Sequence, residues 1–283
     1  MILYVGTITF IFGLVLGSFL NCTAMRIVKK EDWVRGRSHC IHCGHELRAK
    51  DLVPVFSFLS TGGKCRYCYK KISVRYPVTE LAFGLLTLGM YLAVLAGPLR
   101  GFLYGIAELD SLLAPLMIFI RNVFLTGCLF IISLVDLEIY EIPDGCLIAG
   151  AIAFLVTVPF AYALEGDPQK GLPMFVLHRV LAAVLTLVII LAFIFLVEKA
   201  LKRDAMGGGD IKLYSLMALY LGYMGSYEMI LFSCIAGLLF AVIRRSIAPK
   251  APKELPFAPS IALSGYFLLI FSEAITNWYL SFL

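Results

Sequence analysis

The sequence predicts an all-α polytopic membrane protein of about eight transmembrane helices, with a small cysteine-rich insertion between the first two. Hydrophobic residues make up 60% of the 283 residues and charged residues only 15%, whereas soluble domains are roughly half apolar and a quarter charged. The mean hydropathy is +0.90. The apolar residues gather in long segments, and four cysteines lie together in the first polar stretch.

Eight apolar segments are long enough, or nearly so, to cross a hydrocarbon core about 30 Å thick. The first has no charge before Arg26, so it lacks the basic start of a cleaved signal peptide and is predicted to be a retained helix. The sixth is the shortest, and Gly222 and Gly225 mark its end. The segments are 2–25, 76–97, 112–135, 143–163, 176–197, 211–224, 226–244 and 257–280.

The basic residues predict the orientation of these helices. The connection 26–75 holds twelve of the 24 lysines and arginines, which indicates that it is cytoplasmic. Alternation then predicts that 136–144, 198–210 and 245–256 are also inside and that both termini are outside. The net charge of +5 comes largely from this inner face and is explained by anionic lipid, so no nucleic-acid partner is expected.

The insertion 26–75 is predicted to bind zinc. Its cysteines form the pattern C-x2-C-x21-C-x2-C, and two such pairs can bring four thiolates into the tetrahedron that suits zinc. Disulfides are not expected, because the cytosol is reducing. The insertion is too small for a large core, so the metal would supply much of its folding free energy. The predicted ligands are Cys40, Cys43, Cys65 and Cys68.

Three histidines leave an alternative open for this site. His39, His42 and His45 interleave with the first cysteine pair, and any of them could replace a cysteine as ligand. They could equally be solvated residues of a tight turn.

A second group of candidate residues lies in an acidic inner connection. The stretch "DLEIYEIPD" at 136–144 holds four acidic residues and no basic one, against the usual positive-inside trend. Asp144 follows Pro143 at the start of the next segment, which favours a helix-capping role. Asp136 has no such structural role, and it lies at the end of a helix where the dipole disfavours a negative charge.

Asp210 is the second candidate carboxylate, and it follows three glycines, Gly207, Gly208 and Gly209. Helix alternation puts Asp210 on the same side as Asp136. Two carboxylates that face each other over a water are the machinery of an aspartic protease. The glycines would then let a substrate backbone approach Asp210 closely. The alternative is a flexible turn between helices with a capping aspartate.

Three of the charged residues inside apolar segments also need an explanation, namely Glu80, Arg121 and Lys212. Glu80 falls within the second segment, where a charge is costly, so it marks either a functional site or a buried hydrogen bond to a neighbouring helix. Arg121 needs a partner, and a carboxylate such as Glu80 is one candidate. Lys212 can extend to lipid phosphate or act on the nearby carboxylate.

Taken in order, these motifs resemble those of the bacterial type IV prepilin peptidases. These bifunctional enzymes cut prepilin leaders and N-methylate the new terminus, and they belong to the intramembrane aspartyl proteases with a G-x-G-D motif. The resemblance runs nearly end to end, although an aliphatic residue is usual in the family where Cys22 stands. It covers "GSFLNC" at 17–22, "RSHCIHC" at 37–43, "CRYC" at 65–68, "ISVRYPVTE" at 72–80, "DLEIYEIPD" at 136–144, "GGGDIKL" at 207–213 and "PFAPSIALSG" at 256–265.

This resemblance implies a site and a reaction. Asp136 and Asp210 match the catalytic pair, and Gly207 and Gly209 match the motif's glycines. The substrates would be type IV prepilins or pseudopilins of pilus or type II secretion systems, cut after a short basic leader. The location implied is the bacterial inner membrane, with the zinc-binding insertion and the two aspartates on its cytoplasmic side.

The resemblance also implies methylation with S-adenosylmethionine as donor. Gly17 and the "RYPVTE" stretch that ends in Glu80 resemble motifs linked to methyl transfer in the family. The chain is then divided into a first helix (1–25), a methylation-linked zinc-binding domain (26–75) and a membrane domain with the protease site (76–283).

Other functions remain as alternatives at this point. A peptidase without methyltransferase activity would share every protease motif. A transporter would also have intramembrane charges and glycine-broken helices, but its site usually lies near the bilayer midplane. A scaffold that recruits a partner through the zinc insertion would tolerate replacement of Asp136 and Asp210 by asparagine.

Overall fold

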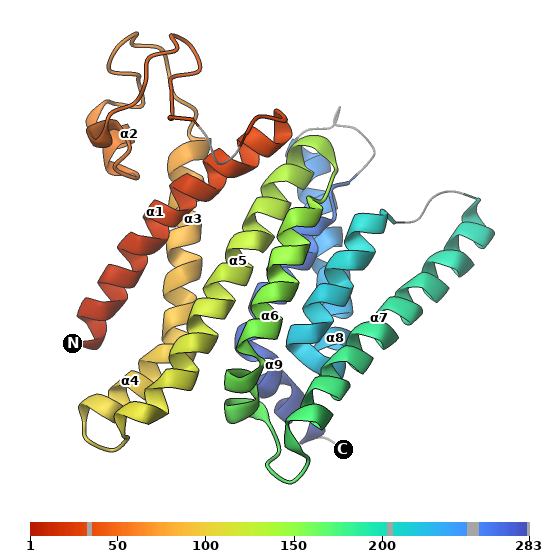
Figure 1. Cartoon of the computed structure of the whole chain (residues 1–283). Coiled ribbons are helices and arrows are strands. Elements are labelled where there is room, and N and C mark those ends of the chain that lie inside the picture. The colour runs from red at the N-terminus through yellow and green to blue at the C-terminus, as the bar shows by residue number, and fades with distance from the viewer. Residues whose placement is uncertain (33–35, 203–205, 248–254, 282–283) are drawn as a thin grey trace. The chain divides into compact units, whose positions relative to one another are not determined.

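The computed structural model describes residues 1–32, 36–202, 206–247 and 255–281 (Figure 1). Within these ranges the chain is helical and has no β-strand, only two isolated β-bridges. It divides into two compact units, Met1–Leu109 and Asp110–Leu283. Four of the basic residues behind the orientation argument lie outside the described residues, namely Arg35, Arg203, Lys250 and Lys253.

The first unit is built on two helices that run side by side in opposite directions (Figure 1). These are α1 (Ile2–Val28) and α3 (Arg75–Met90), and α3 continues through the π-helical turn η2 (Tyr91–Leu95) into α4 (Ala96–Leu103). The insertion between α1 and α3 carries two short helices, η1 (Ala49–Asp51) and α2 (Phe56–Ser60). The first helix thus extends three residues beyond the predicted segment 2–25, and the insertion lies between α1 and α3.

Small residues let α1 and α3 approach closely. A side chain at Gly13 would meet Thr87 of α3 at 2.8 Å, and one at Gly17 would meet the Cβ of Phe83 at 2.9 Å. From the other helix, a side chain at Gly84 would meet Leu14 at 2.7 Å. Helices in lipid associate largely through such close packing, because burial of apolar surface gives little there.

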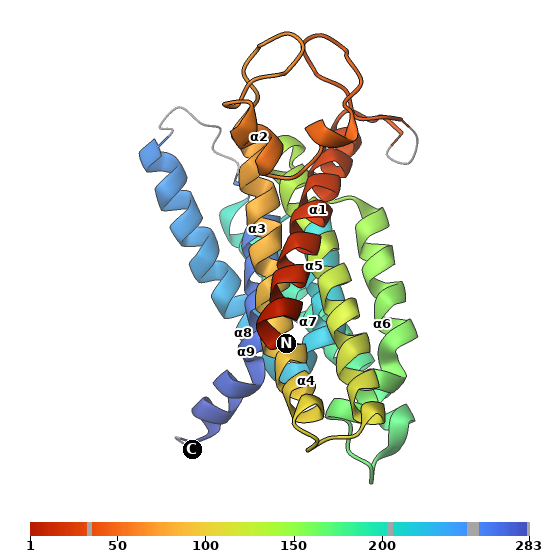
Figure 2. The ribbon, with the colours of Figure 1, turned by 90° about the vertical axis from the view of Figure 1, so that its left-hand side faces the viewer.

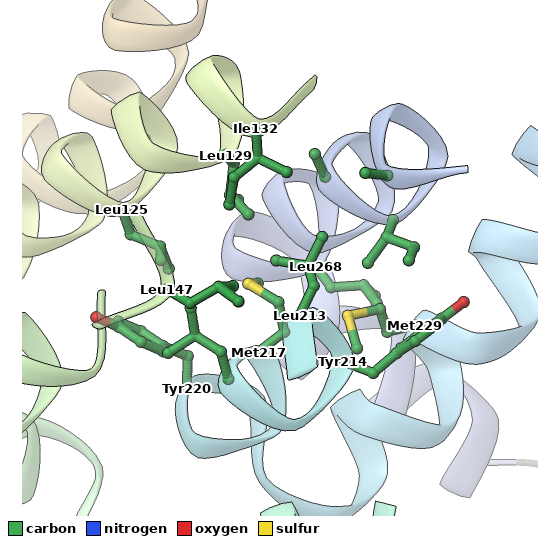
Figure 3. Packing of buried hydrophobic residues seen from close by; sticks show 14 of the residues in the cluster. Leu125, Leu129, Ile132, Leu147, Leu213, Tyr214, Met217, Tyr220, Met229 and Leu268 are labelled. Atoms are coloured by element: carbon green, nitrogen blue, oxygen red, sulfur yellow. The ribbon is translucent and has the colours of Figure 1, made fainter. Parts of the chain in front are cut away.

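The second unit packs five helices around one hydrophobic core. They are α5 (Leu113–Ile139), α6 (Asp144–Glu165), α7 (Gly171–Leu201), α8 (Gly208–Ile247) and α9 (Ala258–Leu280), and the short η3 (Leu109–Leu112) precedes them. Figure 3 shows Leu125 of α5, Leu147 of α6, Met217 of α8 and Leu268 of α9 meeting in this core. Of the candidate spans, α5 is the one most buried by protein, which is why Asp136 near its end lies among other helices.

The long helix α8 folds back on itself at Gly222. Its backbone there has φ 70° and ψ −165°, which is not helical, and the second half turns back beside the first (Figures 1 and 2). A hydrogen bond between the hydroxyls of Tyr214 and Ser233 joins the two halves. These residues would be roughly 28 Å apart along a straight helix, so α8 makes two passes.

This break explains a difference from the expected number of helices. Seven helices of the described chain are long and apolar enough to cross a membrane, where about eight segments were predicted. The predicted segments 211–224 and 226–244 are the two halves of the 40-residue α8. The all-α polytopic fold is therefore confirmed, with two of its passes joined at a glycine instead of a loop.

Arg179 of α7 stabilises this break. Its guanidinium donates a hydrogen bond of 2.6 Å to the carbonyl oxygen of Tyr220, a group that the end of the helical run leaves without its usual partner. The same guanidinium forms an ion pair with Glu165 and lies over the ring of Phe175. A charge inside a membrane helix is thus neutralised and also used to cap a helix end.

Candidate functional site

Asp136 lies in the last turn of α5 and is only 6% exposed. The negative end of its own helix dipole opposes a carboxylate at this position. The start of α9 compensates, since the backbone N–H of Ala258 donates a hydrogen bond of 3.0 Å to Asp136 Oδ2. The first N–H groups of a helix have no partner within the helix and carry partial positive charge. The start of α9 therefore supplies the hydrogen-bond donor and the positive charge that the end of α5 lacks.

Asp210 lies in the first turn of α8 and is half-buried. A carboxylate is favoured there by the helix dipole. No described residue donates a hydrogen bond to its side chain, so both oxygens can accept from water or a ligand. Asp136 and Asp210 interact electrostatically, although they are 74 positions apart in the chain. The helix ends that carry them lie at the same end of the second unit (Figure 1).

Two contacts hold the acidic connection against the glycine stretch. A side chain at Gly209 would meet Ile142 Cβ at 2.9 Å, so the Gly209 backbone packs directly against the Ile142 side chain. Asp144 Oδ1 accepts a hydrogen bond of 2.8 Å from Lys212 Nζ. The connection after α5 and the first turn of α8 therefore form one surface next to the two carboxylates.

The three glycines differ in their surroundings. A side chain at Gly208 would meet nothing within 4 Å, and one at Gly207 would meet only the Asp210 carboxylate, at 3.6 Å. Gly207 and Gly208 thus leave open space beside Asp210, as a substrate-approach role requires. Gly209 instead has a packing role, because only a residue without a side chain fits against Ile142.

The capping role predicted for Asp144 is wrong. Pro143 occupies the N-cap position of α6 and no side chain caps this helix. Asp144 forms an ion pair with Lys212 instead, a partner that neither interpretation of Lys212 had named. Both side chains are more than half exposed, at 65% and 59%, so the pair contributes little, roughly 0–1 kcal/mol.

In the first unit, the four cysteines of the insertion converge. The sulfur atoms of Cys40, Cys43, Cys65 and Cys68 all lie within 4.8 Å of one another, and those of Cys40 and Cys68 are 3.9 Å apart. In a tetrahedral zinc site with Zn–S bonds of about 2.3 Å, sulfur atoms are roughly 3.8 Å apart. The cluster therefore has the donor type and the spacing to hold a metal ion.

Two matching turns build this cluster. The N–H groups of Cys40 and Cys65 donate to the carbonyls of His45 and Lys70, each at 2.9 Å. The residue after the second cysteine of each pair, Gly44 or Tyr69, has a positive φ, of 70° and 59°. Burial opposes ionisation of Cys40, but backbone hydrogen bonds within its turn and the neighbouring thiols lower its pKa to about 7. A thiolate is the form that binds metal.

The histidines of the insertion are not part of the cluster. The ring of His39 lies 3.4 Å from the carbonyl oxygen of Arg37, and that of His45 packs against Tyr67. His42 is exposed. The structure thus favours the second interpretation of these residues, as parts of the turns.

Glu80 and Gly17 meet on the facing sides of α3 and α1. A side chain at Gly17 would come within 3.0 Å of the Glu80 Cα. Glu80 is 8% exposed, and its Oε2 accepts a hydrogen bond of 2.7 Å from the backbone N–H of Val55. The buried hydrogen bond that was one of the two interpretations of Glu80 is therefore present, and its partner Val55 is the N-cap of the short helix α2 in the insertion.

Arg121 has a different environment from the one expected. It is buried, and its Nε donates to Asn122 Oδ1 at 3.1 Å. Its guanidinium lies 5.0 Å from the ring centre of Tyr220. None of the ion pairs found within the described residues involves Arg121, so a cation–π contact takes the place of a carboxylate partner.

Sequence reasoning missed the backbone partner of Asp136. The motif "PFAPSIALSG" drew attention to the start of α9, but a backbone N–H leaves no mark on residue type. Pro259 in the first turn of α9 is the one local signal that a helix begins there.

Comparisons with known proteins cover nearly the whole chain. The model of the bacterial peptidase A24 N-terminal domain matches residues 11–94, and that of the type IV leader peptidase family matches residues 123–242. A Bacillus subtilis (strain 168) protein named prepilin leader peptidase/N-methyltransferase is 31% identical, over 97% of each chain.

Two further relatives are more distant. A protein of the same name from Aeromonas hydrophila is 26% identical, over 97% of this chain and 93% of its own. A "type 4 prepilin-like proteins leader peptide-processing enzyme" from Escherichia coli is 27% identical, over 89% of each chain. No solved structure matches.

Proposed function

The chain belongs to the type IV leader peptidase family, and on this premise we propose that it uses Asp136 and Asp210 to cut the leader from type IV prepilins or pseudopilins. The family and the names of the relatives make it a prepilin peptidase with N-methyltransferase activity. We further infer that it methylates the new N-terminus with S-adenosylmethionine.

One observation carries the protease assignment. Within the second unit, the end of α5 and the start of α8 bring a buried and a half-buried carboxylate into electrostatic reach of each other. Open space lies beside Asp210 at Gly208. A carboxylate pair near a helix end, accessible on one side, has the parts of an aspartyl protease site.

The two carboxylates would share one proton between them. The ionised aspartate removes a proton from water, and the water oxygen attacks the scissile carbonyl carbon. The protonated aspartate donates its proton to the carbonyl oxygen. Collapse of the tetrahedral intermediate breaks the C–N bond as the leaving amine takes a proton. Because the pair acts as a unit, its apparent pKa values belong to both residues.

The location of the pair suits the substrate class. A leader with basic residues is attracted to the acidic connection, where Glu138 and Glu141 are exposed. A scissile bond between such a leader and a hydrophobic helix lies at the membrane boundary. Helix alternation and the basic connection 26–75 support a cytoplasmic location for this site and an outer location for both termini.

The cysteine cluster is proposed to bind zinc, with Cys40, Cys43, Cys65 and Cys68 as ligands. Four thiolates at this spacing leave no open coordination position. The metal would therefore have a structural role, holding the two turns of the insertion together. When bound, S-adenosylmethionine supplies an activated methyl group, and the chain must hold it near the new amino terminus.

The decisive experiment is cleavage of a prepilin by the purified protein in lipid. We expect Asp136→Asn and Asp210→Asn each to lose about 10²–10⁴-fold in cleavage rate. Asp144→Asn is the matched control, since it changes a carboxylate of the same connection that only pairs with Lys212.

The mass of the product separates the remaining alternatives. A gain of one methyl group, seen only with S-adenosylmethionine, supports the dual activity, and cleavage without that gain leaves a peptidase alone. If Asp136→Asn or Asp210→Asn cuts at the wild-type rate, the carboxylate pair is not the catalytic site.

A further inference from the structure

The short helix α2 of the insertion has one packed face and one exposed face. Phe58 packs inward, since a side chain at Gly63 would meet its ring at 2.9 Å. Val53, Phe56 and Leu59 are spaced three residues apart, so they share a helix face. They are 44%, 66% and 69% exposed. These three residues form the apolar face of α2, and an exposed apolar face of this kind marks a contact surface.

A hydrogen bond fixes the level of α2 along the membrane helix α3. The N–H of Val55, the N-cap of α2, donates to Glu80 Oε2 at 2.7 Å. Glu80 lies five residues beyond Arg75, the first residue of α3, which corresponds to about 7.5 Å along the helix axis. The helix α2 therefore starts at the level of the first turns of α3, beside them and not beyond their end (Figure 1).

At this level the membrane helices expose apolar side chains of their own. Val78 and Leu81 of α3, each within two residues of Glu80, are 55% and 39% exposed. On α1, a side chain at Gly17 would come within 3.0 Å of Glu80 Cα, and Phe19 two residues later is 56% exposed. Both helices are long and apolar enough to cross a bilayer. The apolar face of α2 thus lies at the same depth as side chains that contact lipid.

The charge of the insertion suits a lipid surface. Residues 26–75 hold twelve lysines and arginines against four acidic residues. Lys50, just before the stretch 52–59, is exposed. Basic residues next to an apolar face are typical of a segment that lies in the headgroup region of an anionic membrane. A second copy of this chain would bring the same positive charge to the contact, and a soluble protein would have to enter the headgroup region to reach it.

We propose that α2 is an interfacial helix whose apolar face inserts into the lipid leaflet on the insertion's side of the membrane. The bilayer then holds the insertion beside the ends of α1 and α3 that it connects. Neither carboxylate of the proposed protease site takes part, so the inference does not rest on that proposal.

Arg66 connects this lipid contact to the cysteine cluster. Its guanidinium donates a hydrogen bond of 3.1 Å to Ser60 Oγ at the end of α2 and forms an ion pair of 2.9 Å with Asp51 of η1. In the chain, Arg66 directly follows Cys65 of the cluster. Insertion of α2 into the leaflet therefore also restricts where the cluster lies relative to the membrane.

Fluorescence quenching by brominated lipid tests this contact in the full chain. The two native tryptophans, Trp33 and Trp278, are replaced by phenylalanine so that a single new tryptophan reports alone. Phe56→Trp places this probe on the apolar face of α2, and Leu59→Trp places a second one on the same face. In bilayers of brominated phosphatidylcholine mixed with phosphatidylglycerol, we expect each probe to lose about half of its emission or more, because an interfacial helix lies about 5–10 Å deep.

Tyr69→Trp is the matched control. Tyr69 is 75% exposed and belongs to the loop between α2 and α3. Both loops of the insertion point away from α1 and α3 (Figure 2), so this probe should keep its emission in brominated bilayers and lose it to acrylamide in the water.

Three results would overturn the proposal. Unchanged emission of Phe56→Trp and Leu59→Trp in brominated bilayers, with quenching by acrylamide, would mean that the apolar face stays in water. Protection of both probes from lipid bromine and from acrylamide would mean that a protein surface covers this face. Equal quenching of Tyr69→Trp by brominated lipid would mean that the whole insertion lies on the bilayer, with no specific role for α2.

Discussion

A single backbone group compensates for the burial of Asp136. Ala258 N–H, at the positive end of α9, donates to a carboxylate that sits at the negative end of α5. If this hydrogen bond is lost, a buried N–H is left without an acceptor, which costs about 1–3 kcal/mol.

Replacement of Asp136 therefore has two separable effects. We expect Asp136→Asn to remain close to wild type in stability, because its amide oxygen still accepts from Ala258. Asp136→Leu offers no acceptor and should lose about 1–3 kcal/mol. Thermal unfolding in detergent compares the two, and equal melting temperatures would show that the Ala258 hydrogen bond contributes nothing.

Gly208 and Gly209 give a second residue-scale prediction. A methyl group at Gly209 meets Ile142, so Gly209→Ala should destabilise the protein by about 1–3 kcal/mol. Gly208→Ala meets nothing, so its stability should stay within about 0.5 kcal/mol of wild type. The Gly208→Ala variant should still cleave a prepilin more slowly than the wild type, because the added methyl group occupies the space proposed for the substrate. Wild-type cleavage by a stable Gly208→Ala protein would rule out that approach route.

At the scale of single elements, the break in α8 depends on one glycine. The φ and ψ of Gly222 lie in a region that other residues avoid, and a side chain there would also meet Arg179 at 3.2 Å. We expect Gly222→Ala to cost about 1–3 kcal/mol. Gly145→Ala in α6, where a side chain meets nothing within 4 Å, is the control. Equal thermal stability of the two variants would contradict a required turn at Gly222.

The insertion is an element whose folding should depend on metal. It has two short helices and two turns joined at four sulfur atoms, and little apolar core. We expect about one zinc per chain, and loss of the insertion's resistance to protease after chelation or in Cys43→Ser. Cys234→Ser should keep its zinc, since Cys234 lies in α8. Full protease resistance of metal-free protein would mean that the cysteines do not stabilise the insertion.

At the scale of the whole molecule, the topology predicts which connections face each side of the membrane. Gln169, between α6 and α7, should be outside, and Glu141, between α5 and α6, should be inside. A membrane-impermeant maleimide is expected to label Gln169→Cys in intact spheroplasts and Glu141→Cys only after permeabilisation. The reverse pattern would move the carboxylate pair to the outer face and exclude a cytoplasmic leader as substrate.

The sequence by itself determined the fold class, the helix order and the two groups of candidate residues. Long apolar segments can satisfy their backbone in lipid only as helices, so composition and segment length were sufficient. The C-x2-C spacing predicted the cysteine cluster because ligand geometry is largely local. Helix alternation alone predicted that Asp136 and Asp210 lie on the same side of the membrane.

Only the tertiary structure decided the partners of these residues. Asp136 bonds to Ala258, Asp144 pairs with Lys212 and Glu80 accepts from Val55, and each contact joins positions far apart in the chain. It also decided how 211–224 and 226–244 are joined, since a sharp break at Gly222, capped by Arg179 from α7, connects them without a loop. Residue type tells which groups need a partner, but packing between helices selects the partner, and a backbone N–H has no signature in the sequence.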